Sequence, residues 1–203
     1  MSTVLTTEPP VEVPLQPLEL DQDRGRQGMW LFIGSETFLF LMLFVCYFFL
    51  AYGDWRWLRE PAPKLIYACL NVGVLVVSSL VLRWGATHVE LGRFVKGRLA
   101  LGIALFCGFV YLGLSALDYR DHLVQVTPQA DAYGSIFYTI ESFHVAHLIV
   151  GMLMLAFVLV LPNIGRTDRP PHRAYADAAL YWHFVTITWI VTTLLIYGLP
   201  NMR

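Results

Sequence analysis

The sequence alternates between five long apolar stretches and short polar segments that hold most of its charged residues and all of its prolines. Each stretch has at least the roughly 17 residues that an α-helix needs to cross a hydrocarbon core about 30 Å thick. A core helix of a soluble protein would be shorter and would carry a polar stripe. The pattern therefore predicts an all-α polytopic membrane protein, a bundle of five transmembrane helices at about residues 29–52, 65–85, 98–118, 132–161 and 178–199.

The amino-terminal segment has a different character. Four prolines alternate there with acidic residues, and no apolar block follows the initiator methionine. A secretory signal needs a basic start and an apolar core, and this segment has neither. We expect an extended, Pro-rich acidic arm over residues 1–27 and a five-helix membrane domain over residues 28–203.

Composition and charge narrow the class of protein further. The chain of 203 residues is 57% hydrophobic and only 14% charged, with a formal net charge of −1, whereas a soluble domain has about 25% charged residues. The balanced charge excludes a nucleic-acid binder, and the apolar content excludes a disordered chain. Nine of the fourteen Lys and Arg residues lie on the amino-terminal side of the predicted bundle. The positive-inside rule therefore predicts the amino terminus inside and the carboxyl terminus outside.

The charged residues inside the spans indicate where function lies. Away from the helix ends, only Glu36 and Glu141 are formally charged, and such a group costs about 2.5–3.5 kcal/mol unless it faces a protein partner, water or an ion path. Counted along helices of alternating direction, Glu36, His147 and His183 fall at similar depth in the inner half of the bilayer. They form one polar cluster if their helices are neighbours. Alternatively, each bonds separately to a backbone carbonyl or a Ser/Thr hydroxyl.

Helix four and helix five together carry a candidate intramembrane polar cluster of Glu141, His144, His147 and His183. The Glu-x-x-His spacing of Glu141 and His144 is that of di-iron carboxylate bundles, which need a second such pair and two further carboxylates. The sequence has no second pair, and Asp118 lies at the predicted end of helix three, distant in depth. A haem held by two of the histidines is the remaining metal hypothesis, but the ligand set is incomplete. We therefore assign no metal ligands and no catalytic residues.

The three cysteines, Cys46, Cys69 and Cys107, lie in three different apolar spans. The sequence has no Cys-x-x-Cys motif, so neither a zinc knuckle nor a thioredoxin-like pair is available. Buried thiols commonly behave as small hydrophobic groups, and we assign the cysteines to packing.

Several motifs resemble subunit III of the haem–copper oxidases. Residues 28–36 read Gly-Met-Trp-Leu-Phe-Ile-Gly-Ser-Glu, similar to the opening Gly-Met-x-Leu-Phe-Ile-x-Ser-Glu of that family. The Leu-Asn and Ser-Ser pairs of helix two, the Tyr-Gly-Ser and Phe-His-x-x-His motifs of helix four, and the Trp-His-Phe-Val motif of helix five follow in the family's order. The matches cover residues 28–198, and the chain is similar to the short, five-helix bacterial type.

The resemblance implies a non-catalytic subunit III of a respiratory terminal oxidase, which couples electron transfer to oxygen to proton translocation in the bacterial plasma membrane. Haem and copper are then expected in the partner subunits, above all the catalytic subunit I, and phospholipid is expected on this chain. The resemblance places Phe32 and Glu36 at the lipid-binding or proton-uptake side. It gives His144, His147 and His183 the role of bracing the bundle.

Three positions depart from the family pattern. Asp118 stands where a Glu is usual, Thr186 where an Asp is usual, and Glu141 where a small or neutral residue is usual. We therefore expect the polar contacts between helices four and five to be rearranged. Since longer relatives have two additional amino-terminal helices, we also expect lipid or a partner helix to cover the outer face of helix one around Phe32 and Phe40.

Two other functions stay open at this point. An accessory subunit of a nitric oxide reductase has the same five-helix plan and differs mainly in its partner. A small proton or solute transporter would use Glu36 and Glu141 as relay groups, although the sequence shows no inverted repeat. The motifs also leave the electron donor, cytochrome c or quinol, open.

Overall fold

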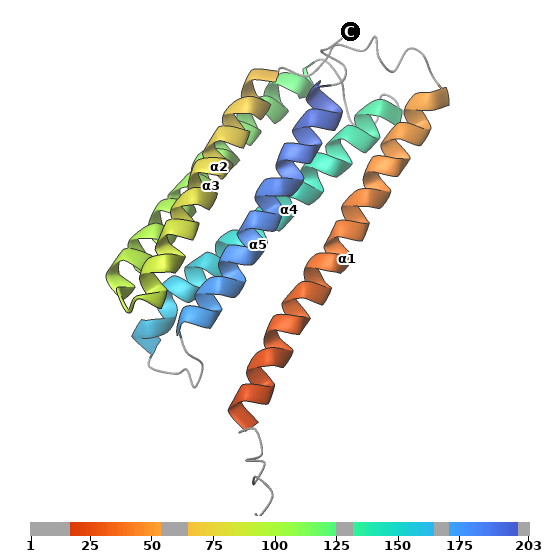
Figure 1. Cartoon of the computed structure of the whole chain (residues 1–203). Coiled ribbons are helices and arrows are strands. Elements are labelled where there is room, and N and C mark those ends of the chain that lie inside the picture. Colours follow the sequence, from red (N-terminus) through yellow and green to blue (C-terminus); the bar gives the residue numbers. More distant parts are fainter. Residues whose placement is uncertain (1–16, 54–64, 125–131, 165–170, 199–203) are drawn as a thin grey trace, which may run out of the picture.

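Five long helices make up the computed structural model, which describes residues 17–53, 65–124, 132–164 and 171–198 (Figure 1). They are α1 (Pro17–Gly53), α2 (Leu65–Glu90), α3 (Phe94–Leu123), α4 (Ala132–Ile164) and α5 (Pro171–Thr192), which continues into a short π-helix, η2 (Thr193–Gly198). All five are long and apolar enough to span a membrane. The predicted class, an all-α membrane bundle of five helices, is confirmed.

The helices extend beyond the apolar runs from which they were predicted. α1 already begins at Pro17, so residues 17–27, predicted as part of an extended arm, are helical. Proline is compatible with the first helical position, because its fixed φ suits the helix and the amide hydrogen it lacks would be unpaired there. α3 likewise continues past residue 118 to Leu123. Residues 1–16 of the predicted arm lie outside the described residues.

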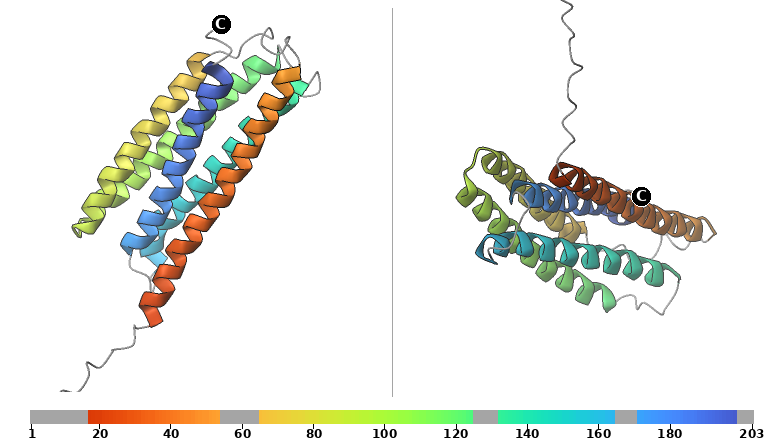
Figure 2. Two further views of the ribbon diagram at one scale, coloured as in Figure 1. Left: turned by 45° about the vertical axis from the view of Figure 1, so that its right-hand side comes forward. Right: turned by 90° about the horizontal axis from the view of Figure 1, so that it is seen from below.

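α5 occupies the centre of the bundle. In its most apolar window 61% of the residues are buried, against 22–28% in the other four helices. α2 and α3 pack along each other on one side of α5, whereas α1 stands at the opposite edge and packs mainly against α4 and α5 (Figures 1 and 2). The largest fully buried side chains include Trp182 and Trp189 of α5. The last helix in the sequence is thus the one around which the others pack.

α2 and α3 form a tight antiparallel hairpin. Gly92 connects them with a φ of +74°, a left-handed conformation that side chains other than glycine rarely adopt. The amide of Arg93 then donates to the carbonyl of His88 at 2.8 Å, which closes the end of α2. Further along the interface, Gly85 faces Ala100 of α3 and the hydroxyl of Tyr175 of α5. Small residues here let α2 and α3 approach closely and leave room for the Tyr175 side chain of α5.

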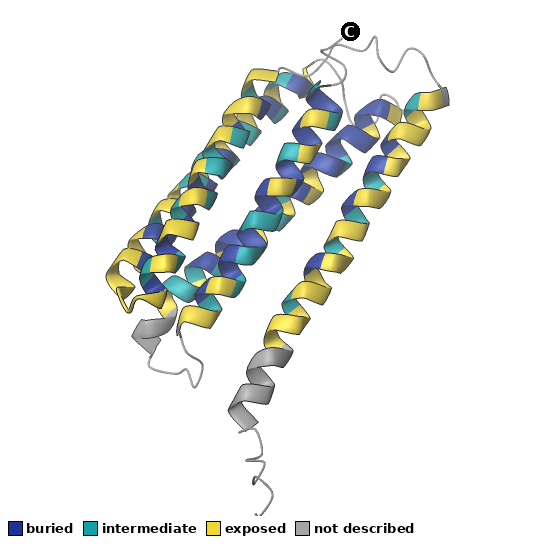
Figure 3. Ribbon diagram, viewed as in Figure 1, coloured by how far each residue is buried: buried dark blue, intermediate teal, exposed yellow. Residues whose placement is uncertain are grey.

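The outer faces of the helices are apolar and exposed (Figure 3). Leu31 and Phe49 of α1 are 76% and 79% exposed, as expected for side chains that contact lipid tails or a neighbouring subunit. Cys46 and Cys69 are exposed on this surface, and Cys107 is half-buried. The assignment of the first two cysteines to interior packing is therefore wrong, because their helix faces point outward.

The close packing at Gly85 gives a first prediction. In Gly85→Ala the added methyl group collides with Ala100 and the Tyr175 hydroxyl, and overpacking of this kind costs about 1–3 kcal/mol. Gly73→Ala on the same helix is the matched control, since nothing lies within 4 Å of its added methyl group. Thermal unfolding of the detergent-purified protein measures the difference. Equal unfolding temperatures for the two variants would contradict the close approach.

Candidate functional site

Glu36 of α1 and His147 of α4 form an ion pair inside the membrane-spanning region. The carboxylate oxygen Oε2 lies 2.8 Å from Nε2 of the imidazole, and the side chains are 19% and 12% exposed. The other ring nitrogen, Nδ1, donates to the carbonyl of Phe143 at 2.6 Å. Because a neutral imidazole has only one N–H, the contact with Glu36 needs a second proton, on Nε2 or on the carboxyl group. The pair therefore holds one shared proton and has no net charge.

Aromatic rings enclose this pair on the bundle side. Phe40 is buried, and the centroid of its ring lies 4.9 Å from that of His147 and 6.4 Å from that of Phe184. Phe32 remains 41% exposed and stacks on Tyr181 of α5 at 5.8 Å. The prediction that the face around Phe40 lies outward is thus wrong. Phe40 and Glu36 point toward α4 and α5 because the polar groups that Glu36 needs are there, and only Phe32 stays at the edge.

His144 joins three helices at the centre of the bundle. It is fully buried, receives a hydrogen bond from the Tyr111 hydroxyl of α3 at 2.9 Å on Nδ1, and donates from Nε2 to the Val185 carbonyl of α5 at 3.1 Å. A neutral imidazole satisfies both contacts with its one donor and one acceptor. The ring also packs 4.7 Å from that of Trp189. Its geometry is that of a structural contact between α3, α4 and α5.

His183 does not join the Glu36–His147 pair. Its Nδ1 is hydrogen-bonded to the Ser79 hydroxyl of α2. The adjacent Trp182 donates its indole N–H to Ser78 at 2.9 Å. The Ser-Ser motif of α2 therefore binds two consecutive residues of α5. Of the two arrangements open from the sequence, a shared cluster holds for Glu36 and His147, and a separate hydroxyl contact holds for His183.

Asp118, Glu141 and Tyr197 form a second acidic contact. Both carboxyl groups are 5% exposed, and the fully buried Tyr197 hydroxyl lies 2.9 Å from Oδ2 of Asp118 and in hydrogen-bond contact with Glu141. The sequence placed Asp118 at the end of helix three, but α3 continues for another turn and carries it into the interior. Tyr197 was not predicted, because an aromatic residue in an apolar run gives no signal. The continuation of α3 was detectable from residues 119–123, which contain no helix breaker.

The four residues of the candidate cluster therefore lie in separate contacts. Glu141 contacts Tyr197, His144 contacts Tyr111, His147 contacts Glu36, and His183 contacts Ser79. Thr186, the other position that departs from the family, donates to the carbonyl of Trp182 within its own helix. Among the described residues, no three His, Cys, Asp or Glu side chains are grouped so that they could hold a metal ion. The contacts of Glu141, His144, His147 and His183 each join two helices of the bundle.

The fold and these contacts define a multi-pass membrane subunit whose interior polar groups pair between helices. Residues 21–199 match the family model of cytochrome c oxidase subunit III, and the chain belongs to that family. The resemblance noted in the sequence is thereby confirmed, and the chain is a subunit of a haem–copper terminal oxidase, an oxidoreductase complex.

Similar proteins include bacterial and animal members of the family. The cytochrome c oxidase subunit 3 of Corynebacterium diphtheriae is 32% identical over 181 residues, covering 84% of this chain and 85% of the relative. That of Bacillus subtilis is 29% identical over 175 residues, covering 84% of each chain. That of Gallus gallus is 30% identical over 181 residues, covering 85% of this chain but 68% of the longer relative. These names favour an oxidase over a nitric oxide reductase or a transporter.

The bridging role of His144 is testable by a double-mutant cycle. His144→Ala leaves the Tyr111 hydroxyl and the Val185 carbonyl without their partner, and each such buried group costs about 1–3 kcal/mol. With Tyr111→Phe as the second change, we expect a coupling of about 0.5–3 kcal/mol in thermal unfolding. The haem spectrum of the purified oxidase should not change. His88→Ala is the control, because the partly exposed His88 side chain contacts the carbonyl and the ring of Trp84 within its own helix.

The Tyr197 hydroxyl gives a third prediction. Tyr197→Phe removes a hydroxyl that contacts both Asp118 and Glu141, and we expect a loss of about 1–3 kcal/mol in the free energy of unfolding. Adding Glu141→Gln should recover part of this loss, because one acidic group fewer then needs a donor. The same change at Tyr52, which is 95% exposed, is the control. Identical unfolding of Tyr197→Phe and Tyr52→Phe would show that the hydroxyl bridges nothing.

Proposed function

We propose that this chain is the subunit of the oxidase that binds no redox cofactor and that sustains proton uptake and stability of the catalytic haem–copper subunit I. The observation that carries the proposal is the Glu36–His147 pair, which holds one proton in a partly exposed position inside the membrane-spanning region. The other acidic contact, Asp118 with Glu141 and Tyr197, is buried inside the bundle. Of these two contacts, the one at Glu36 is the one that a proton or a lipid headgroup can reach.

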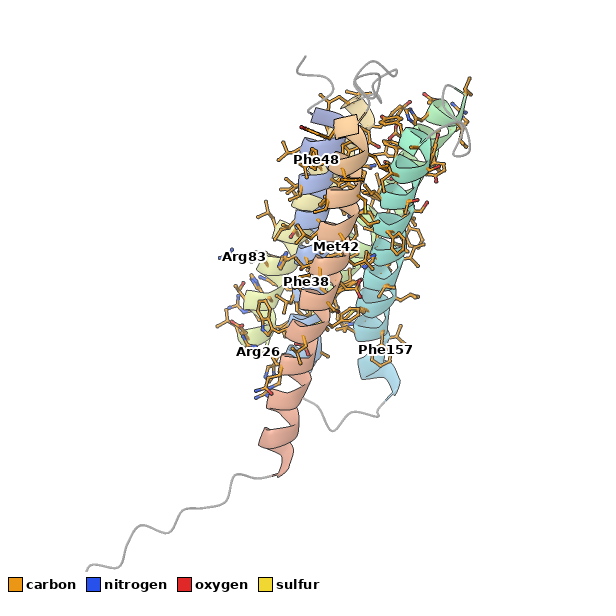
Figure 4. The ribbon with its side chains drawn as sticks, turned by 90° about the vertical axis from the view of Figure 1, so that its right-hand side faces the viewer. Arg26, Phe38, Met42, Phe48, Arg83 and Phe157 are labelled. Carbon is orange, nitrogen blue, oxygen red and sulfur yellow. The ribbon has the colours of Figure 1, made fainter. Side chains whose placement is uncertain are left out.

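The exposed side of α1 supports a lipid or a partner helix as its neighbour. Phe38, Met42 and Phe48 extend from α1 away from the bundle, and Phe157 does so from α4 (Figure 4). Apolar side chains of this kind are equally stable against acyl chains and against another helix. Phe32, at the edge of this surface, lies one helical turn from Glu36. A headgroup near the carboxyl group and a tail along the aromatic side chains fit this arrangement.

The proposal includes the orientation of the chain in the membrane. The five described spans put the beginning of α1 and the end of η2 on opposite sides of the membrane, and the two lie at opposite ends of the bundle in Figure 1. With the amino terminus in the cytoplasm of a bacterial cell and the domain in its plasma membrane, most Lys and Arg residues lie inside. Glu36, nearer the amino-terminal end of the apolar span Gly25–Tyr52, then lies on the side from which the oxidase takes up protons.

Purification of the affinity-tagged chain in mild detergent tests the assignment of partners. We expect haem and copper to co-elute with it, together with subunit I and the other oxidase subunits. Their identification also reveals whether cytochrome c or quinol is the electron donor. A homo-oligomer of this chain that elutes without haem and moves protons in vesicles would contradict the proposal.

The role of the pair is tested with Glu36→Gln. An amide keeps the shape and hydrogen-bonding capacity but removes titration, so we expect normal assembly and initial oxygen consumption with a several-fold shorter lifetime of activity during turnover. Ser35→Ala is the matched control, because the exposed Ser35 hydroxyl bonds only to the Phe32 carbonyl of the same helix. If Glu36→Gln keeps both the rate and the lifetime of wild type at every pH, the proton-uptake role is wrong.

A further inference from the structure

A second surface feature lies away from α1, on the opposite side of α4. α3 and α4 enclose an open hollow of about 490 Å³. It is lined mainly by apolar and small side chains of the two helices: Leu112, Ser115, Ala116, Tyr119, Leu123 and Val145, with Arg120 and Ser142 at its rim. None of the contacts of the Glu36–His147 pair involves these residues. The hollow is therefore a separate site.

The length and depth of the hollow match half a bilayer. From Leu112 to Leu123 the lining follows α3 for about 17 Å at 1.5 Å per residue, close to the roughly 15 Å of hydrocarbon in one leaflet. Leu123 ends the membrane-spanning part of α3. One end of the hollow thus lies at the membrane interface, and the other lies near the middle of the bilayer.

The hydroxyl groups of the lining are paired within the protein. Ser115 accepts a hydrogen bond from the Asn71 side chain at 3.0 Å, and the hydroxyls of Tyr119 and Ser142 bond to each other at 3.1 Å. Along most of its length, the hollow therefore presents hydrocarbon and satisfied polar groups. A flexible apolar chain suits such a surface better than a polar ligand does.

A cation stands at the interfacial end. The Arg120 side chain is 73% exposed and bonds to its neighbour Asp121 through one nitrogen at 3.3 Å. A guanidinium has five N–H donors, so most of them remain available in the headgroup region. Planar pairs of donors match the oxygens of a phosphate. The charge of the rim is complementary to that of an anionic phospholipid.

We propose that this groove between α3 and α4 binds one acyl chain of an anionic phospholipid, whose phosphate contacts Arg120. The guanidinium at the interfacial end favours a lipid over a partner helix as the occupant, since it matches the oxygens of a phosphate. The site is independent of the lipid-facing surface of α1. It gives the subunit a lipid at the leaflet opposite to the one proposed for Glu36.

The test uses the purified oxidase complex, stripped of loosely held lipid and then titrated with phosphatidylglycerol or phosphatidylcholine. Bound lipid is counted by native mass spectrometry. Ala116→Phe fills the groove, and Arg120→Gln removes its charge. Two matched controls change the same helix off the groove: Leu117→Phe at an exposed neighbouring position and Arg98→Gln at the other end of α3.

We expect Ala116→Phe to lose one bound phosphatidylglycerol and Arg120→Gln to bind it about tenfold more weakly, which corresponds to about 1.4 kcal/mol. Phosphatidylcholine carries the same phosphate next to a quaternary ammonium group, so Arg120→Gln should weaken its binding less than that of phosphatidylglycerol. Both controls should bind phosphatidylglycerol as wild type does. Unchanged binding in both groove variants would overturn the proposal. So would loss of a partner subunit in Ala116→Phe, because a protein helix would then occupy the groove.

Discussion

Inside a bilayer, no water is available to a polar side chain, and this constraint determines how the five helices meet. Every helix has an apolar outer face that is equally stable against lipid, so apolar burial alone does not select neighbours. Hydrogen bonds do: α1 meets α4 through Glu36 and His147, and α3 meets α4 and α5 through Tyr111 and His144. α2 meets α5 through its adjacent serines. Close packing around α5 then completes the bundle.

The two contacts that contain acidic side chains supply hydrogen-bond partners to carboxyl groups within the membrane-spanning region in different ways. Glu36 pairs with a histidine of another helix and remains partly exposed. Asp118 and Glu141 meet a tyrosine hydroxyl in the interior of the bundle. The departures from the family pattern at Asp118 and Glu141 thus occur together in one contact between α3, α4 and η2.

The five spans could be predicted from the sequence because length and apolarity decide what crosses a membrane. The beginning of α1 could not, since Pro17 and the polar residues after it are helical ahead of the apolar core, whereas the continuation of α3 past Asp118 was detectable. The pairing of Glu36 with His147 was one of two arrangements that their similar depth left open. Depth alone also suggested His183 as a partner of Glu36, but His183 is hydrogen-bonded to Ser79 of α2 instead. Hydroxyl partners such as Ser79 and Tyr197 lie within apolar runs. Which groups they contact depends on how each helix is rotated about its axis, and a hydropathy pattern does not predict that rotation.

The central position of α5 has a consequence for how the chain is made. α5 and η2 follow the other four helices in the chain, yet they supply contacts to Ser78, Ser79, Asp118 and His144. Until this segment enters the bilayer, the first four helices lack these contacts, which help to fix their positions relative to one another. Closure of the bundle therefore depends on insertion of the fifth described span.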